Sequence, residues 1–506
     1  MATSRFQPVS ALLACTLLLG LAGCAAPGAQ PTSLAGRAQE DAAWKSLAQT
    51  SAAEAFGELD RARKGKLVPT DAGFSGDELK RVDQDGDGLL SKIEALAFAT
   101  RLTDALRDAE PAPPLQTKPA NPALPALSDF QPTAQANEAE LLVDAGAIYP
   151  AMLAAIRDAK RSIQVDYYLL GGAIGDQFAD ALIGKAREGV QVRVMLDGWA
   201  ANQGGPTGAQ LKPVIKRLQD AGIDQRFYPV EWLPRNPGWF ANRFLIDHNK
   251  LLVLDRESAF VGSMNIFDLA VMNHDLMVKL RGPMAQELAG MMDEEFSQTR
   301  VQAPPIAVAQ GPTTSLIRGT KTSVRQRSTK DILLQNLAQA KKSVSMAIFD
   351  FSDLDVVDGL INAQRRGLDV KVLVDRHNTN DKYVPLAQYI NIYGMPNLSP
   401  VSRLVQANVP VKWFDPAQHD SELHMKMTVF DGEKAMLGST NYTYQAFNNF
   451  RETGVEITGG RTVEQLCAMF ETDWQGRASA ATSLSFKERV VAKVSDYMER
   501  KRLGWW

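Results

Sequence analysis

The strongest constraint on this chain is a segment that occurs twice. It reads HNKLLVLDRESAFVGSMN at 248–265 and HMKMTVFDGEKAMLGSTN at 424–441. Each copy has a His, a Lys two positions later, an Asp five positions after that and then Gly-Ser-x-Asn, and equivalent positions are 176 apart (424 − 248). A single His-x-Lys arises easily by chance, but two copies in register indicate an internal repeat. We therefore expect two similar halves.

The pattern ahead of each copy predicts the fold class. Segments with the apolar spacing of a helix alternate with segments that have the apolar pattern of a strand. This alternation predicts an α/β sandwich with a mixed, partly parallel sheet in each half. We place half one at 137–300, a Pro-containing connector at 301–328 and half two at 329–480. The predicted elements are helices 149–160 and 176–188 with strands 162–168 and 190–197, and then helices 331–341 and 354–366 with strands 343–349 and 369–375.

The repeated segments are expected to enter these sheets as strands. Alternate side chains of a strand share a face, so the His and Lys of each copy should point the same way. The next strand should deliver the Ser and the Asn to the same edge, and the Gly before each Ser allows close backbone approach. The residues gathered in this way are His248, Lys250, Ser263, Asn265, His424, Lys426, Ser439 and Asn441.

These residue types suit the cleavage of a phosphodiester. Lys and Asn side chains, with Ser hydroxyls, can bind its oxygens and stabilise the charge that develops in the transition state. One His can attack phosphorus to form a phospho-histidine, while the other protonates the leaving alcohol and then activates the incoming one. This step requires no metal, and no carboxylate-rich cluster stands beside the motifs in the sequence.

The two motifs resemble the His-x-Lys-x(4)-Asp pair that defines the phospholipase D superfamily, over about residues 140–480. Segments 262–265, 275–278 and 282–283 are most similar to bacterial cardiolipin synthases and related members that act on phospholipids. The resemblance implies two α/β halves around one shared site. It favours His248 as the nucleophile and His424 as the acid/base, although the copies are chemically alike and the reverse order stays open.

The resemblance also implies roles for four acidic residues. An acidic residue shortly after the Asn holds the imidazole in its attacking tautomer, and Asp275 and Glu452 are the candidates here. Half one has Asp where Glu is usual. The motif residues Asp255 and Asp431 are expected to be structural. The histidines outside the motifs, which are His274, His377 and His419, are interpreted as surface or loop residues.

An EF-hand pattern precedes the two halves at 83–94, DQDGDGLLSKIE. Upstream, 60–71 keeps the terminal Asp residues and the central Gly but has Ala62 and Lys64 at two ligand positions. It is either a degenerate partner that pairs at loop position eight or an unrelated loop. We expect a small all-α EF-hand region at 24–107 that binds one Ca²⁺, followed by a Pro/Ala-rich linker at 108–136. The predicted ligands are Asp83, Asp85, Asp87, Leu89 through its carbonyl, Ser91 and Glu94.

The first 23 residues have the pattern of a secretion signal. The uncharged run 9–23 is shorter than the ~20 residues of a membrane span but suits a signal-peptide core. It ends in Leu-Ala-Gly-Cys24, which resembles the lipobox of bacterial lipoproteins, in which the Cys is lipidated. The alternative is an ordinary signal with an incidental Cys. Ala25 and Ala26 imply, by the same resemblance, the periplasmic face of the outer membrane.

Charge and aromatic content favour a lipid over a nucleic acid. The net charge of −3 is unlike the basic balance of nucleic-acid-binding proteins, and three cysteines are too few for a disulfide framework. The aromatic insertion 228–240 and the basic C-terminal helix 481–506, which ends Trp505-Trp506, suit a membrane surface, although either can pack on the protein instead. We expect a membrane-attached phosphatidyltransferase or phospholipase D. The alternatives are a periplasmic nuclease and a catalytically silent calcium-binding surface protein.

Overall fold

The computed structural model describes parts of 46–80, then 82–107, 137–202, 205–228, 246–297, 308–310, 316–323, 326–376, 396–415, 422–481 and 484–500. The predicted signal peptide, Cys24, the linker 108–136, all but Tyr228 of the aromatic insertion, His377, His419 and the terminal Trp pair lie outside these residues. None of the described helices has the length and apolar character to cross a membrane.

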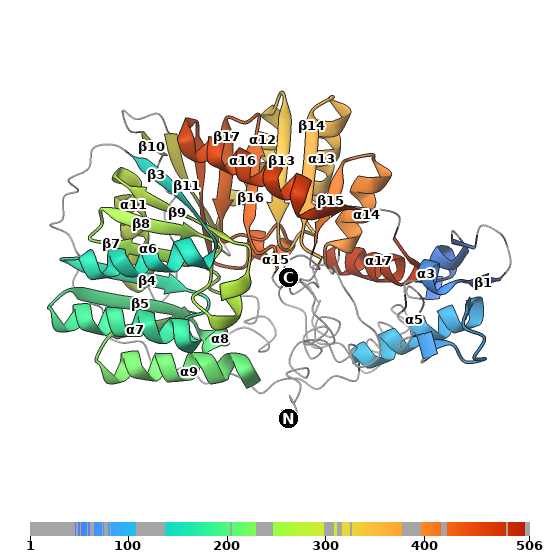
Figure 1. The fold of residues 1–506 in the computed structure, drawn as a ribbon, viewed down its shortest axis with the longest axis horizontal. Helices are drawn as coiled ribbons and strands as arrows, with labels where there is room; N and C mark the ends of the chain where they lie inside the picture. The colour runs from blue at the N-terminus through green and yellow to red at the C-terminus, as the bar shows by residue number, and fades with distance from the viewer. Residues whose placement is uncertain are drawn as a thin grey trace, which may run out of the picture.

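Half one is a seven-stranded sheet in the order β3-β9-β8-β7-β4-β5-β6 (Figure 1). β4, β5 and β6 run parallel and the other neighbours antiparallel, as the sequence predicted for a mixed sheet. The strands are β3 (Glu138–Val143), β4 (Ser162–Tyr167), β5 (Gln191–Asp197), β6 (Asp224–Tyr228), β7 (Lys250–Leu254), β8 (Ser258–Gly262) and β9 (Leu276–Arg281). The helices are α6 (Asp144–Asp158), α7 (Gly172–Arg187), α8 (Gly198–Asn202), α9 (Gly205–Asp220), the 3₁₀ turn η1 (Asp268–Met272) and α11 (Pro283–Ser297).

Half two repeats this order as β11-β18-β17-β16-β13-β14-β15, with β10, β12 and β19 added. Its strands are β10 (Val308–Gln310), β11 (Leu316–Ser323), β12 (Gln326–Arg327), β13 (Ser343–Ile348), β14 (Asp369–Val374), β15 (Val411–Phe414), β16 (Lys426–Phe430), β17 (Lys434–Gly438), β18 (Glu452–Thr458) and β19 (Ala478–Ala480). Its helices are α12 (Ser328–Gln339), α13 (Leu354–Arg365), α14 (Leu398–Gln406), α15 (Tyr444–Asn448), α16 (Gly460–Gly476) and α17 (Phe486–Arg500).

The predicted connector at 301–328 differs from the structure, because β11 is a full strand of the second sheet. It pairs with β18 from Leu316 to Thr322 and takes the place that β3 takes in half one. Its sequence, LIRGTKTS, contains a Gly and has no regular apolar alternation. Pairing with β18, rather than its own pattern, therefore makes this segment a strand, and the local sequence carries little signal for it.

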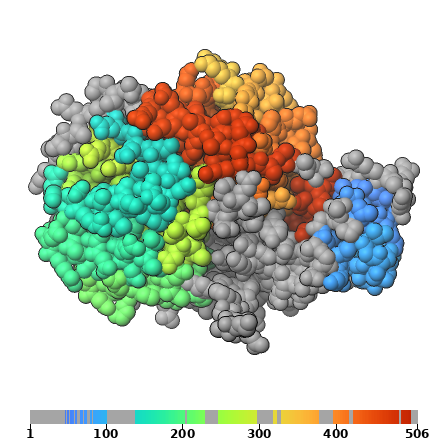
Figure 2. Space-filling view, viewed as in Figure 1, coloured from blue at the N-terminus to red at the C-terminus, as the bar shows by residue number. Residues whose placement is uncertain are grey.

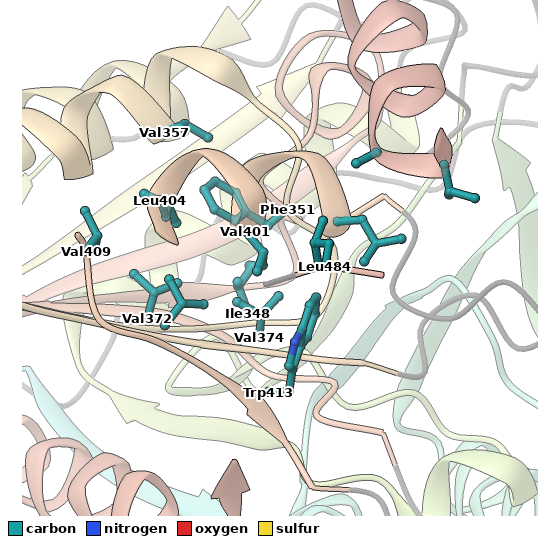
Figure 3. Packing of buried hydrophobic residues seen from close by; sticks show 14 of the residues in the cluster. Ile348, Phe351, Val357, Val372, Val374, Val401, Leu404, Val409, Trp413 and Leu484 are labelled. Atoms are coloured by element: carbon teal, nitrogen blue, oxygen red, sulfur yellow. The ribbon is translucent and has the colours of Figure 1, made fainter. Parts of the chain in front are cut away.

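Helices cover the outer face of each sheet. In half one, α6, α7, α8 and α9 pack on the sheet through residues such as Ile148, Phe178 and Val214. In half two, α13 and α14 supply Val357, Val401 and Leu404, which lie over Ile348, Val372, Val374 and Trp413 of the sheet (Figure 3). With both faces covered, central strands such as β7 and β16 are buried along their whole length.

The inner faces of the two sheets share one core. α11 contributes Leu288 and Met292, and α16 contributes Leu466 and Phe470, to a cluster that also contains residues of β7, β8, β9, β16, β17 and β18. Gly438 permits close approach inside half two, because a Cβ there would lie 2.4 Å from the Gly454 Cα atom. The halves therefore form one packed body around the ends of β7 and β16.

The N-terminal region packs on the C-terminal helix. β1 (Lys66–Leu67) and β2 (Leu90–Ser91) pair antiparallel with Leu67 opposite Leu90, which are the eighth positions of the two predicted loops. Phe486 at the start of α17 contacts the rings of Phe56 and Phe98, and Figure 2 shows the two regions in contact. The buried Val490 and Val491 support the packing interpretation of the described part of this basic helix.

Candidate active site

The two repeated segments meet at the interface between the halves. His248 and His424 lie just ahead of β7 and β16 and are buried, as are Lys250 and Lys426, the first residues of those strands. The His248 amide donates to the Arg451 carbonyl (2.9 Å), and the His424 amide donates to the His274 carbonyl (2.9 Å). Each histidine segment is therefore held by backbone of the other half.

The imidazoles are oriented by carboxylates from opposite halves. Nδ1 of His248 lies 2.9 Å from Oε1 of Glu452, and Nδ1 of His424 lies 2.7 Å from Oδ2 of Asp275. The sequence proposed both carboxylates for this role but did not show that the pairs cross. With Nδ1 held by a carboxylate, Nε2 is the ring nitrogen left to react with phosphorus or a leaving oxygen.

The Ser hydroxyls, which the sequence assigned to phosphate binding, instead contact these carboxylates. Ser263 Oγ donates to Asp275, and Ser439 Oγ donates to Glu452. Neither Ser has any exposed surface. A buried carboxylate must have its oxygens satisfied, and the nearby hydroxyl provides a donor to the oxygen that the imidazole does not use. Ser263 and Ser439 therefore support the orienting carboxylates.

The two lysines form a buried cationic pair. The Lys250 ammonium donates to the His248 carbonyl (2.7 Å) and lies 5.2 Å from the Tyr168 ring centroid. Lys426 repeats this with the His424 carbonyl and the Phe349 ring, at 4.8 Å. Burial lowers the pKa of Lys250 to about 7 and that of Lys426 to about 8. A phosphate anion placed here would restore their charge, because an opposite charge favours the protonated form.

The two histidine–carboxylate pairs differ in charge. Burial, reinforced by the nearby lysines, lowers the pKa of His248 well below its usual value, whereas the pKa of His424 falls to about 4. Burial raises the pKa of Glu452 well above its usual value. Burial acts the same way on Asp275, but His424 and Lys426 outweigh it and hold its pKa below normal. His424 thus faces the more strongly ionised carboxylate, which favours a proton on its imidazole.

The amides of Asn265 and Asn441 lie at equivalent places and are largely buried. Asn441 Nδ2 donates to Asp350 Oδ2 (3.2 Å), and the Tyr149 hydroxyl donates to the backbone carbonyl of Asn265 (2.6 Å). Among the described residues, the side-chain oxygens of both Asn residues lack a hydrogen-bond partner. These amides therefore have hydrogen-bonding capacity that the described residues do not use.

The motif aspartates lie at the far ends of the strands, where their carboxylates accept hydrogen bonds from backbone amides. Asp255 accepts from the backbone N–H groups of Lys160, Arg161 and Ser162. Asp431 accepts from the equivalent amides at 341–343. Both residues have positive φ, 54° and 57°. Each carboxylate therefore fastens the turn after its strand to the start of β4 or β13.

Two further charged residues at the interface escaped the sequence reasoning. Arg451 is fully buried and donates to Asp166 and Asp247 of half one at 3.2 and 2.8 Å and also to Glu295. His274 was interpreted as a surface or loop residue, but it is only 5% exposed and bonds two carboxylates. The sequence did contain a signal for both residues, because each directly precedes an orienting carboxylate.

Comparison with known proteins agrees with this geometry. The family described as "Cardiolipin synthase, PLD-like domain" matches residues 152–300 and 333–474. A probable cardiolipin synthase of Bacillus subtilis is 25% identical over 362 residues, which are 68% of this chain and 67% of the relative. A cardiolipin synthase of Alkalihalophilus pseudofirmus is 26% identical over 380 residues, 71% of this chain and 70% of the relative.

The fold is also that of a solved structure. The phosphatidylserine synthase of Haemophilus influenzae superposes with a TM-score of 0.55 at 12% sequence identity. The match covers 72% of this chain and 94% of the other, so it includes both halves. At this identity the likeness shows a shared fold.

The crossed pairing can be tested with two isosteric variants. Asp275→Asn should alter the tautomer of His424, which lies in the other half, and leave His248 unchanged, because an amide can donate to Nδ1 where the carboxylate accepted from it. Glu452→Gln should do the reverse. ¹⁵N chemical shifts of the five imidazoles report the tautomers directly. If each variant instead affected the histidine of its own half, the crossed arrangement would be wrong.

Proposed function

The chain belongs to the cardiolipin synthase family with phospholipase D-like domains, and from this premise we propose that it transfers phosphatidyl groups between alcohols through a covalent phospho-histidine. It is an enzyme of the phospholipase D type, and its relatives in Bacillus subtilis and Alkalihalophilus pseudofirmus are named cardiolipin synthases. The observation that carries the proposal is the pair of imidazoles, each held at Nδ1 by a carboxylate of the other half, beside two buried lysines.

The first step forms one bond and breaks one. The phosphodiester anion binds between Lys250 and Lys426, where its charge raises the pKa values of the lysines and imidazoles. Neutral His248 attacks phosphorus through Nε2, and the bond from phosphorus to the leaving alcohol breaks. His424 delivers a proton from Nε2 to the departing oxygen, and Asp275 stabilises the imidazolium before that transfer.

The second step reverses these roles. An incoming alcohol gives its proton to His424 Nε2 as its oxygen attacks phosphorus, and the bond between phosphorus and His248 breaks. The assignment of His248 as the nucleophile is supported by its pKa, which burial holds well below the usual value so that the imidazole stays unprotonated, and by the ionised Asp275 beside His424. An acceptor alcohol gives transfer, and water gives hydrolysis.

The lipid proposal is tested on vesicles of phosphatidylglycerol. We expect conversion to cardiolipin and glycerol, detected by mass spectrometry, and loss of activity by a factor of about 10³ or more in both His248→Ala and His424→Ala, because neither imidazole can replace the other. His424→Ala should still accumulate some phospho-enzyme, whereas His248→Ala should accumulate none.

The matched control is Lys493→Ala on the exposed face of α17, which lies outside the site and should retain full activity. Release of phosphatidic acid without cardiolipin would make the enzyme a hydrolase. Cleavage of DNA with no turnover of lipid would overturn the phospholipid proposal in favour of a nuclease. Inertness on both substrates would favour a calcium-binding protein without catalysis.

We propose in addition that the loop 83–94 binds one Ca²⁺ as an EF-hand. The residues fit such an ion, because carboxylate oxygens of Asp83, Asp85 and Asp87 lie within 4.8 Å of one another. The Lys66 ammonium contacts Asp85 at 3.2 Å and also Asp87, so this loop already attracts a cation. Ser91, Glu94 and the Leu89 carbonyl would complete the ligand set, and the ion would neutralise the acidic loop beside the paired strands β1 and β2.

Calorimetric titration of the full chain with CaCl₂ tests this proposal. We expect one binding event that Glu94→Gln weakens by about tenfold or more, because the twelfth loop position chelates with both oxygens. Lys66→Met should strengthen binding, because Ca²⁺ would no longer compete with the ammonium. Absence of a binding heat in the unmodified chain would exclude the calcium site.

We propose that Cys24 is lipidated and attaches the chain to the periplasmic face of the outer membrane. The supporting observation is the sequence Leu-Ala-Gly-Cys24 at the end of an apolar segment, with Ala25 and Ala26 after it. Acyl chains at one cysteine give firm attachment. Detergent-phase partitioning of the cell-expressed chain should shift to the aqueous phase in Cys24→Ser. Unchanged partitioning in that variant would contradict lipidation at Cys24.

A further inference from the structure

A cationic side chain directly precedes each orienting carboxylate. Arg451 precedes Glu452, and His274 precedes Asp275. The two positions are equivalent in the backbone, because each accepts the amide of a catalytic histidine and donates its own amide to the segment before that histidine. His274 donates to the Glu422 carbonyl (2.9 Å), and Arg451 donates to the Ile246 carbonyl (2.8 Å). Both residues therefore join the halves at the site.

The two cations differ in whether they can lose their charge. Arg451 lies among Asp166, Asp247 and Glu295, and burial against these carboxylates leaves it permanently charged. Glu295 is also paired with Lys321. At the equivalent position, the imidazole of His274 also pairs with carboxylates at the interface, but it is a group that can lose its proton.

The surroundings of His274 require the imidazolium. Nδ1 lies 2.8 Å from Oδ1 of Asp144, and Nε2 lies 2.9 Å from Oδ2 of Asp473. Ionised carboxylates only accept hydrogen bonds, so both ring nitrogens must carry a proton. The ring also stacks on Phe414, with centroids 5.6 Å apart and an interplanar angle of 11°. Asp144 starts α6 in half one and Asp473 lies on α16 in half two, so the charged triad crosses the interface.

The triad is connected to His424 through Asp275. The same Oδ1 of Asp144 that faces His274 accepts the Asp275 amide at 3.1 Å, and the Asp144 amide donates to the Asp275 carbonyl at 2.9 Å. Asp144 therefore contacts the Asp275 peptide on both sides. The Asp275 carboxylate then holds Nδ1 of His424. His274 is one contact away from the group that orients the proposed acid/base.

We propose that charged His274 is a positioning residue that, through Asp144 and Asp275, holds His424 in its reactive orientation and makes the reaction sensitive to alkaline pH. The proposal rests on the proposed transferase function, although the charge state of His274 can be measured without it. His274 contacts no substrate in this scheme. Its contribution is to the geometry of Asp275 and to the docking of α16 on half one.

The direction of the pH effect follows from the pKa. Burial lowers the pKa of His274, but the hydrogen bonds to Asp144 and Asp473 outweigh burial and raise it to about 9. A folded pKa above the ordinary value of 6.5 means that the contribution is complete below pH 6.5 and is lost as the pH rises through about 9. The other charged groups around the ring are Arg477, 3.5 Å from Asp473, together with Asp275, Glu422 and His424, and Phe414 supplies an uncharged face.

The first experiment measures kcat for phosphatidylglycerol between pH 6 and 10. His274→Phe should lower kcat by about tenfold or more below pH 9 and leave KM unchanged, because small misplacements of a catalytic group are costly. The deficit should shrink above pH 9, where the unmodified imidazole is itself neutral. Asp473→Asn should retain kcat at pH 6. The fall of kcat at alkaline pH, which we call the alkaline limb of the pH profile, should move to lower pH, since one of the two carboxylates that raise the pKa of His274 is gone. His274→Arg should restore kcat and move the limb upward.

A control variant separates positioning from stability. Thr462→Val removes another α16 contact to half one, the hydrogen bond from the Thr462 hydroxyl to the Ala139 carbonyl (2.7 Å). It should destabilise the same interface without moving the alkaline limb. Lys250 and Lys426 are present in all these variants, so a difference between variants in the pH of the alkaline limb reports the titration of His274. An identical displacement in Thr462→Val and Asp473→Asn would overturn the proposal.

A second measurement does not depend on activity. ¹⁵N shifts of His274 in the full chain should show both ring nitrogens protonated at pH 7.5. A neutral His274 at that pH would overturn the inference whether or not the chain acts on lipid. A protonated His274 in a chain without transferase activity would instead locate the failure in the proposed function.

Discussion

The exchange of carboxylates between the halves is the interaction on which the rest of the site depends. Burying two imidazoles and two ammonium groups together is unfavourable, because each loses hydration and the cations repel. Asp275 and Glu452 supply the compensating groups, and each supplies them to the opposite half. A half on its own would therefore contain a histidine without its orienting carboxylate and a carboxylate without the histidine that it orients.

The interface outside the site follows the same requirement. Arg451 with its three carboxylates and His274 with its two are located where the backbones of the halves exchange hydrogen bonds. Apolar packing of α11 and α16 surrounds these charges. The nonpolar contacts provide the association, while the charge networks require one particular alignment, since a shifted alignment would leave buried charges without partners.

Much of this could be predicted from the sequence, and the failures have physical reasons. The repeat specified both histidine–lysine pairs and the structural aspartates, because their spacing matches strand geometry. The ends of the strands β4, β5, β13 and β14 were each predicted to within one residue from their apolar runs. β11 was missed because pairing with β18 determines it. The contacts of Ser263 and Ser439 with the orienting carboxylates were missed, because strand alternation places a side chain at one edge of the sheet without showing which neighbour it meets.

The crossing itself was not accessible from the sequence, since it depends on contacts between segments more than 100 residues apart. The importance of His274 was missed but had a signal in the sequence. Position relative to the carboxylates was the usable signal. Arg451 and His274 occupy equivalent places in the repeat, and comparing the copies at positions outside the motif would have singled them out. The asymmetric pairs, Asp275 with Glu452 and His274 with Arg451, are where the copies differ in charge behaviour.

The exchanged carboxylates also restrict how the two copies can diverge. A change at Glu452 is felt by His248, and a change at Asp275 is felt by His424, so compensating substitutions must arise in the other copy. Because the two copies belong to one chain, the two imidazoles need not be identical, and each can have its own environment, as Asp275 and Glu452 show. Neither copy can be lost or evolve independently of the other.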